Sequence, residues 1–251
     1  ERFAAAFTDG EVEVMNLHDV DIKGGCLGCV QCGYDNQCVY QGKDGYVDFY
    51  NTKLKPADIL VFAGAIRDRY LSSTWKTFFD RSFFNGHAPS LMGKQFGFII
   101  AGPLSQIPNL RQIFEAWVQM QRANLVDFVT DEVVNASELD AQLQGLAQRL
   151  VWCADQGYVP PQTFLGVGGY KLFRDDIWGR LRIAFLADHR AYKRLGEYDF
   201  PQKNLVFRVL NTVVPPLFRI RKVRETFMAR LRKGVTQPYQ QVVASVDSEE
   251  S

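Results

Sequence analysis

The chain has 251 residues, of which 47% are hydrophobic, and this is enough to form a substantial buried core. No apolar run reaches the roughly 18 residues that a membrane span needs, and the start does not resemble a signal peptide, so we expect a cytoplasmic protein. The net charge of +1 hides an uneven distribution, −5 in residues 1–150 and +6 in residues 151–251.

Strand and helix patterns alternate along the first 155 residues. After a helical opening (ERFAAAF), the strand patterns are mostly continuous apolar runs, which suit strands buried on both faces of a parallel sheet. Ser72 or Ser73 is placed to cap one helix, and Ser137 with Asp140 forms a capping pattern for another. The alternation predicts an α/β fold with a doubly wound parallel sheet, in which ligands bind at the carboxyl ends of the strands. The expected strands are 11–17, 57–65, 95–101 and 125–130, and the expected helices are 44–55, 72–84, 107–124 and 135–155.

The pattern changes after residue 156. Pro160-Pro161 and the glycines of residues 166–169 predict a turn-rich link. We therefore expect an α/β domain over residues 1–156 and a basic helical C-terminal extension over residues 157–251, with a disordered tail from Ser245. The extension is expected to contain several helices between residues 172 and 246, interrupted at Pro201, Pro215, Pro216 and Pro238.

Four of the five cysteines lie close together in GCLGCVQCGYDNQCV, residues 25–39. They follow a C-x2-C-x2-C-x5-C pattern with glycines between them, so their thiolates can converge on one centre from a single loop. This spacing is typical of 4Fe-4S ligation, although zinc and thiol or disulfide chemistry stay open as alternatives. Cys153 has apolar neighbours and is expected to be a packing residue. The candidate metal ligands are Cys26, Cys29, Cys32 and Cys38.

Three stretches of the first half form a set: NLHDVDIKGGCLGCVQCGYDNQCV, ADILVFAGAI and STWKTFFDR, the last with Lys76, Asp80 and Arg81. Together they resemble the iron-sulfur flavoprotein branch of the NADPH-dependent FMN reductase family. The resemblance implies a flavodoxin-like fold, bound FMN, a 4Fe-4S cluster on the four cysteines, and a homo-oligomer, either dimer or tetramer. It also implies NAD(P)H or a ferredoxin-type carrier as the electron donor. By spacing alone, Lys76 and Asp80 are interpreted as a surface ion pair one helical turn apart.

The resemblance also implies where FMN would bind. One loop corresponds to GAIRDRYLS, residues 64–72, and another begins at Gly102. Relatives typically have a proline and an aromatic residue where this chain has Ala65 and Arg67, so Arg67 either places positive charge near a reduced flavin or is a solvated loop residue. The phosphate-binding loop of the family is not in this sequence, which implies a truncated chain or a lost phosphate site. The implied flavin contacts are Ala65, Ile66, Arg67, Leu71, Ser72, Gly102 and Pro103.

Residues 203–233 carry nine Lys and Arg and one acidic residue, Glu225, interleaved with apolar residues. Such a segment can lie on an anionic membrane surface or contact an acidic partner such as a ferredoxin. Because most amphipathic helices face a core, we favour a helical subdomain whose apolar face packs on the protein or on a second subunit. No nucleic-acid-binding motif is present.

The cysteine spacing together with the family resemblance thus predicts an FMN-dependent oxidoreductase that passes electrons between a 4Fe-4S cluster, FMN and an external carrier or acceptor. No side chain is expected to act as a nucleophile or a general base. One alternative is an NAD(P)H-dependent FMN or quinone reductase without a cluster. Another is a non-catalytic scaffold whose flavin site has decayed.

Overall fold

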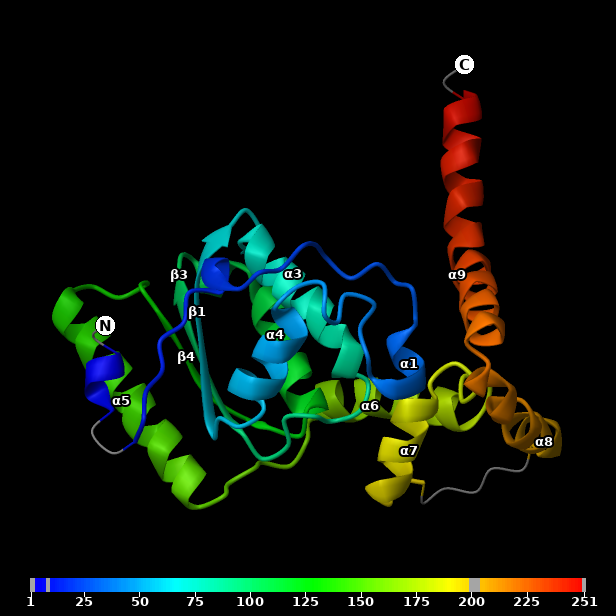
Figure 1. Cartoon of the computed structure of the whole chain (residues 1–251). Coiled ribbons are helices and arrows are strands. Elements are labelled where there is room, and N and C mark those ends of the chain that lie inside the picture. The colour runs from blue at the N-terminus through cyan, green and yellow to red at the C-terminus, as the bar shows by residue number, and fades with distance from the viewer. Residues whose placement is uncertain (1–2, 8–9, 199–203, 250–251) are drawn as a thin grey trace. The chain divides into compact units, whose positions relative to one another are not determined.

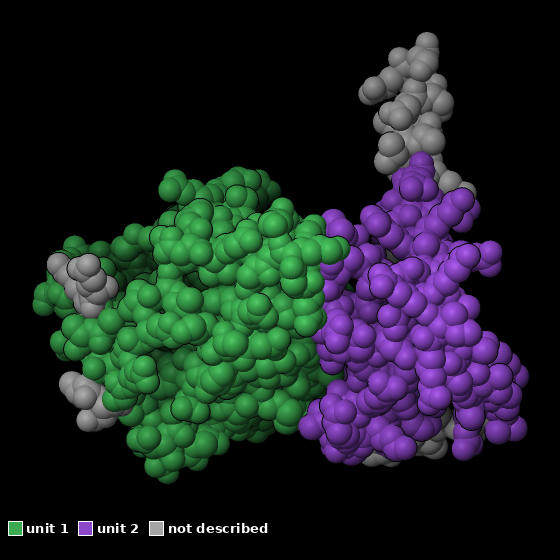
Figure 2. All heavy atoms as spheres, in the orientation of Figure 1, with its two compact units in different colours: residues 1–25, 40–172 green, residues 26–39, 173–251 purple. Residues whose placement is uncertain are grey.

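A computed structural model describes residues 3–7, 10–198 and 204–249, without the side chains of 235, 238 and 241–249. Contacts within the chain define two compact units, which Figure 2 shows in different colours. The sheet unit comprises residues 1–25 and 40–172, and the helical unit comprises residues 26–39 and 173–251.

This division differs from the two parts expected from the sequence. The sequence placed a single boundary after residue 156, whereas the first unit extends to Leu172. The cysteine segment, residues 26–38, was expected within the α/β domain, but its contacts assign it to the helical unit.

The sheet unit contains a four-stranded sheet of order β2-β1-β3-β4. Its three long strands, β1 (Ile59–Arg67), β3 (Gln95–Ala101) and β4 (Asn124–Thr130), are parallel, and β2 (Tyr70–Leu71) pairs antiparallel with the end of β1. Parallel strands that are adjacent in chain order, with helices between them, match one half of the flavodoxin-like strand order (Figure 1). The structure therefore confirms the predicted α/β fold with a doubly wound, mostly parallel sheet and a helical C-terminal extension.

Helices cover both faces of this sheet (Figure 1). On one face α5 (Ala136–Asp155) packs Leu146 and Leu150 against Val129 of β4. On the other face α3 (Ser73–Arg81) and α4 (Pro108–Met120) contact the side chains that alternate to that side, and the packing there is aromatic. Phe98 illustrates it, because its ring stacks at 4.7 Å on Phe114 and at 5.1 Å on Phe128. Each face of the sheet therefore has its own core.

Most elements of the sheet unit lie where the sequence predicted them. The helix expected over 44–55 is α2 (Tyr46–Phe49) continued by a π turn (Tyr50–Leu54). Ser72 caps α3 by accepting the Trp75 N–H. The cap of α5 was assigned to the wrong residue, since the N–H of Glu138 donates to Asn135 at 2.9 Å rather than to Ser137.

The strand expected over residues 11–17 is wrong. Within the described residues, 11–16 form no ladder with the sheet, and Val12, Val14 and Met15 are exposed. In the opening segment, the described residues 3–7 contain a 3-10 turn, Ala4–Ala6. Alternating β-type residues do not fix a strand by themselves, because strand pairing and burial provide most of the stabilisation.

The C-terminal part contains longer helices than expected. α6 (Phe164–Trp178) includes the glycines of residues 166–169, which were predicted to form a turn. Its start is capped from α4, because Gln119 Oε1 accepts the N–H groups of Thr163 at 2.9 Å and Gly166 at 3.2 Å. The remaining helices are α1 (Cys32–Asp35), α7 (Leu186–Arg194), α8 (Leu205–Val213) and α9 (Arg221–Glu249).

The proline interruptions are only partly as predicted. α8 ends before Pro215, which begins a 3-10 turn (Pro215–Arg219), so that interruption is confirmed. α9 continues past Pro238 and reaches Glu249, so the interruption there and the disordered tail from Ser245 are wrong for the described residues. Pro201 lies outside the described residues.

Two glycines offer a matched test of packing. A Cβ on Gly64 of β1 would lie 2.7 Å from Trp75 Nε1, so Gly64→Ala is expected to destabilise the protein by about 1–3 kcal/mol. A Cβ on Gly168 of α6 would meet open space, so Gly168→Ala is expected to stabilise it by up to about 1 kcal/mol. Urea denaturation midpoints measure both changes, and a midpoint for Gly64→Ala at or above that of the wild type would contradict the packing argument.

Candidate functional site

The cysteine segment is a compact loop that leads into a short helix. Gly28 and Val30 both have positive φ, 57° and 61°, so the chain bends sharply between Cys26 and Cys32. α1 then begins at Cys32, and the N–H of Gly28 donates to Cys26 Sγ at 3.5 Å. The segment therefore forms the tight loop that the cysteine spacing suggested.

Contacts with α7 and α9 hold this segment in the helical unit. A Cβ on Gly33 would lie 2.3 Å from the carbonyl oxygen of Ala184, so only glycine allows this close approach of the two backbones. The guanidinium of Arg224 lies 4.2 Å from the ring centre of Tyr34. Val30 also packs on the apolar cluster that includes Phe218. The loop is thus part of a packed structure.

Cys32 lies within electrostatic range of the other three clustered cysteines. Burial, followed by the charges of Asp188 and of the other three cysteines, raises the pKa of the Cys32 thiol to about 12. The metal-free Cys32 is therefore a protonated thiol at neutral pH. A bound cation would reverse this balance, because a coordinated thiol loses its proton.

The donor set fits an iron-sulfur cluster by type. All four thiols are free, Cys26 is exposed, and the other three are partly buried. Among the residues that the structure describes, however, no three His, Cys, Asp or Glu side chains converge on a preformed metal site. Holding a cluster would therefore require the loop to draw its thiols together.

The thiols of the metal-free, reduced protein are expected to differ in reactivity. Cys26 is exposed, whereas burial and nearby negative charge keep Cys32 protonated, and the thiolate is the reactive species. Iodoacetamide at pH 8 should therefore modify Cys26 well before Cys32, as followed by peptide mass spectrometry. Labelling of Cys32 first would contradict this arrangement.

The first implied flavin loop is a tight hairpin in the structure. β1 runs through Ala65, Ile66 and Arg67 and returns through Asp68, which has a φ of 59°, to β2. Arg67 is the last residue of β1, and its side chain is exposed.

The two other implied contacts from this loop have structural roles. Leu71 is only 3% exposed and belongs to the core. Ser72 uses its hydroxyl oxygen to cap α3 at 3.5 Å. Both side chains are therefore already engaged by the fold.

The second implied flavin loop is bonded to the end of β4. The N–H of Gly102, which has a φ of 114°, donates to Asp131 Oδ1 at 2.7 Å. The N–H of Ser105 donates to Glu132 Oε2 at 3.1 Å, and its hydroxyl donates to the other oxygen of Glu132. These hydrogen bonds from Ser105 lower the pKa of Glu132. Pro103 is exposed between them.

The backbone N–H groups of Gly102 and Ser105 are therefore already occupied. The two backbone donors that would face a flavin are already paired with carboxylates, and those carboxylates place negative charge at the same edge of the sheet. Asp131 and Glu132 follow directly after the predicted strand 125–130, so their position was visible in the sequence, but their contact with the neighbouring loop was not.

Arg81 has a role that was not predicted from the sequence. Its guanidinium forms a two-pronged ion pair with Asp44 at 2.6 and 3.0 Å, and both side chains are fully buried. The same group donates to the carbonyl of Gly24 at 3.0 Å and lies 4.2 Å from the ring centre of Tyr40. Arg81 thus ties together the two chain stretches that flank the cysteine segment.

A second ion pair on the same helix, α3, is much more exposed than the pair of Arg81 and Asp44. Lys76 and Asp80 form the predicted ion pair, and both side chains are well exposed. This exposed ion pair is a reference for how little such a pair contributes to the free energy of unfolding.

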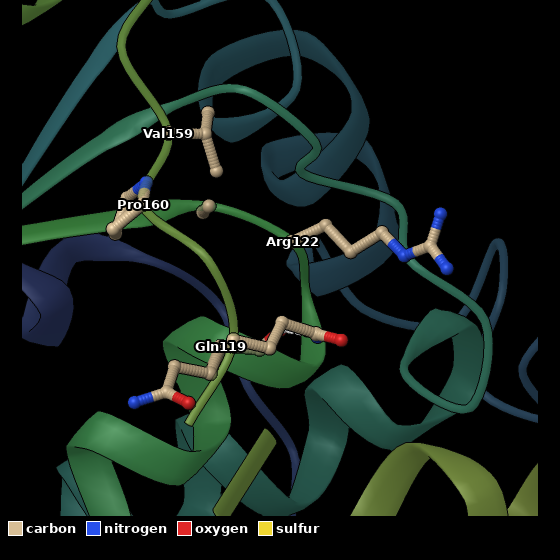
Figure 3. Close-up of a pocket in the computed structure, with 6 residues that line it drawn as sticks. Gln119, Arg122, Val159 and Pro160 are labelled. Carbon is tan, nitrogen blue, oxygen red and sulfur yellow. Dashed lines mark hydrogen bonds between the residues drawn. The ribbon is translucent and has the colours of Figure 1, made fainter. Parts of the chain in front are cut away.

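A cavity of about 190 Å³ lies near the start of β4, at the end of the sheet opposite to the implied flavin loops. Figure 3 shows the residues that line it. Ala123, just before β4, lines it, and the guanidinium of Arg122 lies 4.7 Å from the ring centre of Tyr170. Its volume is below the roughly 300 Å³ at which ligand pockets begin. It is also remote in the sheet from the implied flavin loops. The lining residues are Gln119, Arg122, Ala123, Val159, Pro160 and Gln162.

Comparisons with known proteins find similarity among solved structures. No family model matches the chain, and no curated protein matches it. Among solved structures, the chain is similar to the Trp repressor binding protein from Bacillus subtilis, with 24% sequence identity and a TM-score of 0.33. The alignment covers 51% of this chain and 92% of that one.

Proposed function

We propose that this chain is an oxidoreductase that transfers electrons through a 4Fe-4S cluster held by Cys26, Cys29, Cys32 and Cys38. The observation that supports the proposal is the loop of residues 26–38, which carries four free thiols in one packed unit and couples Cys32 electrostatically to the other three. Four sulfur donors on so short a segment are the ligand type that iron-sulfur clusters use.

When bound, the cluster would supply one-electron transfer. The chain would hold it through the four thiolates and position their loop through Gly33, Tyr34 and the apolar cluster beneath them. The N–H of Gly28, which donates to Cys26 Sγ, is the kind of hydrogen bond that tunes a sulfur ligand.

FMN is the second redox group that the family resemblance implies, with NAD(P)H or a ferredoxin-type carrier as the donor. The proposal assigns FMN no step, because the Gly102 and Ser105 donors are paired with Asp131 and Glu132. Flavin binding would require these pairs to open.

Anaerobic purification of the full chain tests the proposal. The expected result is about four iron and four sulfide per chain together with broad visible absorption. Bound FMN without iron would instead support an NAD(P)H-dependent FMN or quinone reductase. Stoichiometric zinc would assign the cysteines to a structural site and overturn the proposal.

A non-catalytic scaffold is a second candidate, and the occupied loop donors favour it. If the flavin site is only masked, Asp131→Asn combined with Glu132→Gln should increase FMN binding, as measured by quenching of flavin fluorescence. If the site has decayed, neither the wild type nor this variant should bind FMN, and the anaerobic protein should contain no iron.

A further inference from the structure

The helix α8, labelled in Figure 1, has apolar side chains that are largely exposed. Five of its nine residues are large aliphatic side chains that are between 42% and 68% exposed. A helix that stabilises a core buries such residues. They are Leu205, Val206, Val209, Leu210 and Val213.

A polar side chain, Asn211, attaches α8 to the protein. Asn211 is only 5% exposed, and its amide donates to the carbonyl of Gly179 at 2.8 Å and reaches that of Trp178 at 3.5 Å. At about 100° per residue, Asn211 points away from the middle of the apolar arc. The helix is therefore attached through Asn211 and turns its five large aliphatic side chains outward. They do not pack on the chain's own core, which was one of the two arrangements favoured from the sequence, the other being packing on a second subunit.

The apolar surface continues beyond α8. Leu217, Ile220 and Val223 are between 41% and 57% exposed. The intervening Phe218 is 1% exposed and anchors this stretch in the cluster with Ala184. We call α8 together with residues 214–223 the α8 surface.

Positive charge surrounds the α8 surface. Arg208, Arg219 and Lys222 are exposed, and within the described residues no ion pair is found for them. Arg208 also lies near enough to Arg182 to add to the effect of burial in lowering the pKa of Arg182. Among the described residues, the charge of these three side chains is therefore not neutralised by an ion pair.

Exposed aliphatic side chains together with exposed positive charge favour one kind of partner for the α8 surface. A two-fold contact between two copies through the α8 surface would place basic side chains against basic side chains. An anionic lipid surface neutralises them and accepts the aliphatic side chains at the depth of the headgroups. No described helix is long and apolar enough to cross a bilayer. We propose that the α8 surface docks the protein on the surface of an anionic membrane.

Docking would also position the cysteine segment. Val30 and Tyr34 pack on the same cluster as Phe218, so the segment is attached to the element that meets the lipid. The docking proposal itself rests only on the exposed apolar side chains and their charges, and it holds whether or not the cysteines bind a cluster.

Vesicle flotation of the full chain tests this proposal. The protein is expected to float with vesicles of phosphatidylcholine and phosphatidylserine, but not with phosphatidylcholine alone, and added salt should weaken binding. Val206→Asp with Val209→Asp is expected to weaken binding by about tenfold or more, because two inserted aliphatic side chains are lost. Arg208→Gln with Lys222→Gln should weaken it as well.

Matched controls separate this surface from general effects. Val134 is 92% exposed in the sheet unit, so Val134→Asp should leave binding unchanged. Lys43→Gln with Arg69→Gln removes two exposed basic residues of the sheet unit and should also change little. Circular dichroism confirms that each variant stays folded. Flotation with neither vesicle type, equal loss in the controls, or a dimer that the Val206 and Val209 variant dissociates would each overturn the proposal.

Discussion

Cys32→Ser is expected to abolish iron retention by the anaerobically purified chain. Cys32 begins α1 and is the cysteine most strongly affected by its surroundings, with a pKa of about 12 in the metal-free protein. Serine has nearly the same size but is a poor ligand for iron, so the variant removes one of four donors without a large change in packing. Iron and sulfide per chain are expected to fall at least tenfold, as measured by colorimetric analysis and the visible spectrum.

Two further variants make this result interpretable. Cys26→Ser should lose iron because it removes a proposed ligand. Because Cys26 is exposed, this variant should not change the stability of the metal-free protein. Cys153 is buried in α5 of the sheet unit, so Cys153→Ala should keep its iron. Iron loss in the Cys153 variant as well, or full iron content in the Cys26 and Cys32 variants, would show that the segment does not hold a cluster.

Arg81→Leu is expected to destabilise the protein by about 3–5 kcal/mol, because it leaves the Asp44 carboxylate buried without its cation. The variant also removes the donor to the carbonyl of Gly24, just before the cysteine segment. Urea denaturation measures the loss. Lys76→Ala breaks the exposed pair on the same helix and should cost only about 0.3–0.5 kcal/mol.

The buried Arg81–Asp44 ion pair is also expected to make the stability of the protein depend on pH in acid. Burial by itself would raise the pKa of Asp44, but the hydrogen bonds from Arg81 and from the N–H of Lys23 outweigh burial and lower it. A lowered folded-state pKa means that this stabilisation is complete above about pH 4 and is lost as the pH falls through the folded-state value. The wild type should therefore lose stability in acid more steeply than Asp44→Asn. Parallel pH profiles would contradict the ion pair.

Particular residues show how far the sequence predicts this fold and site. QFGFIIA predicted β3 over residues 95–101 because a continuous apolar run suits a strand buried on both faces. Ser72 predicted the start of α3 because a hydroxyl can take up a free N–H at a helix start. In contrast, residues 11–17 had strand composition but pair with no strand in the described part of the chain, and Pro238 did not end α9. The sequence shows two carboxylates directly after β4, but it does not predict that they accept hydrogen bonds from the loop after β3.

The sequence by itself determined the α/β order of elements and the four-cysteine spacing, because both depend on neighbouring residues in the chain. Only the tertiary structure decided where those features act. The cysteine segment joins the helical unit because Gly33 contacts Ala184, which is distant in sequence. The α8 surface faces outward because Asn211 binds carbonyls at the end of α6. Both depend on contacts between segments far apart in the chain, which periodicity and spacing do not encode.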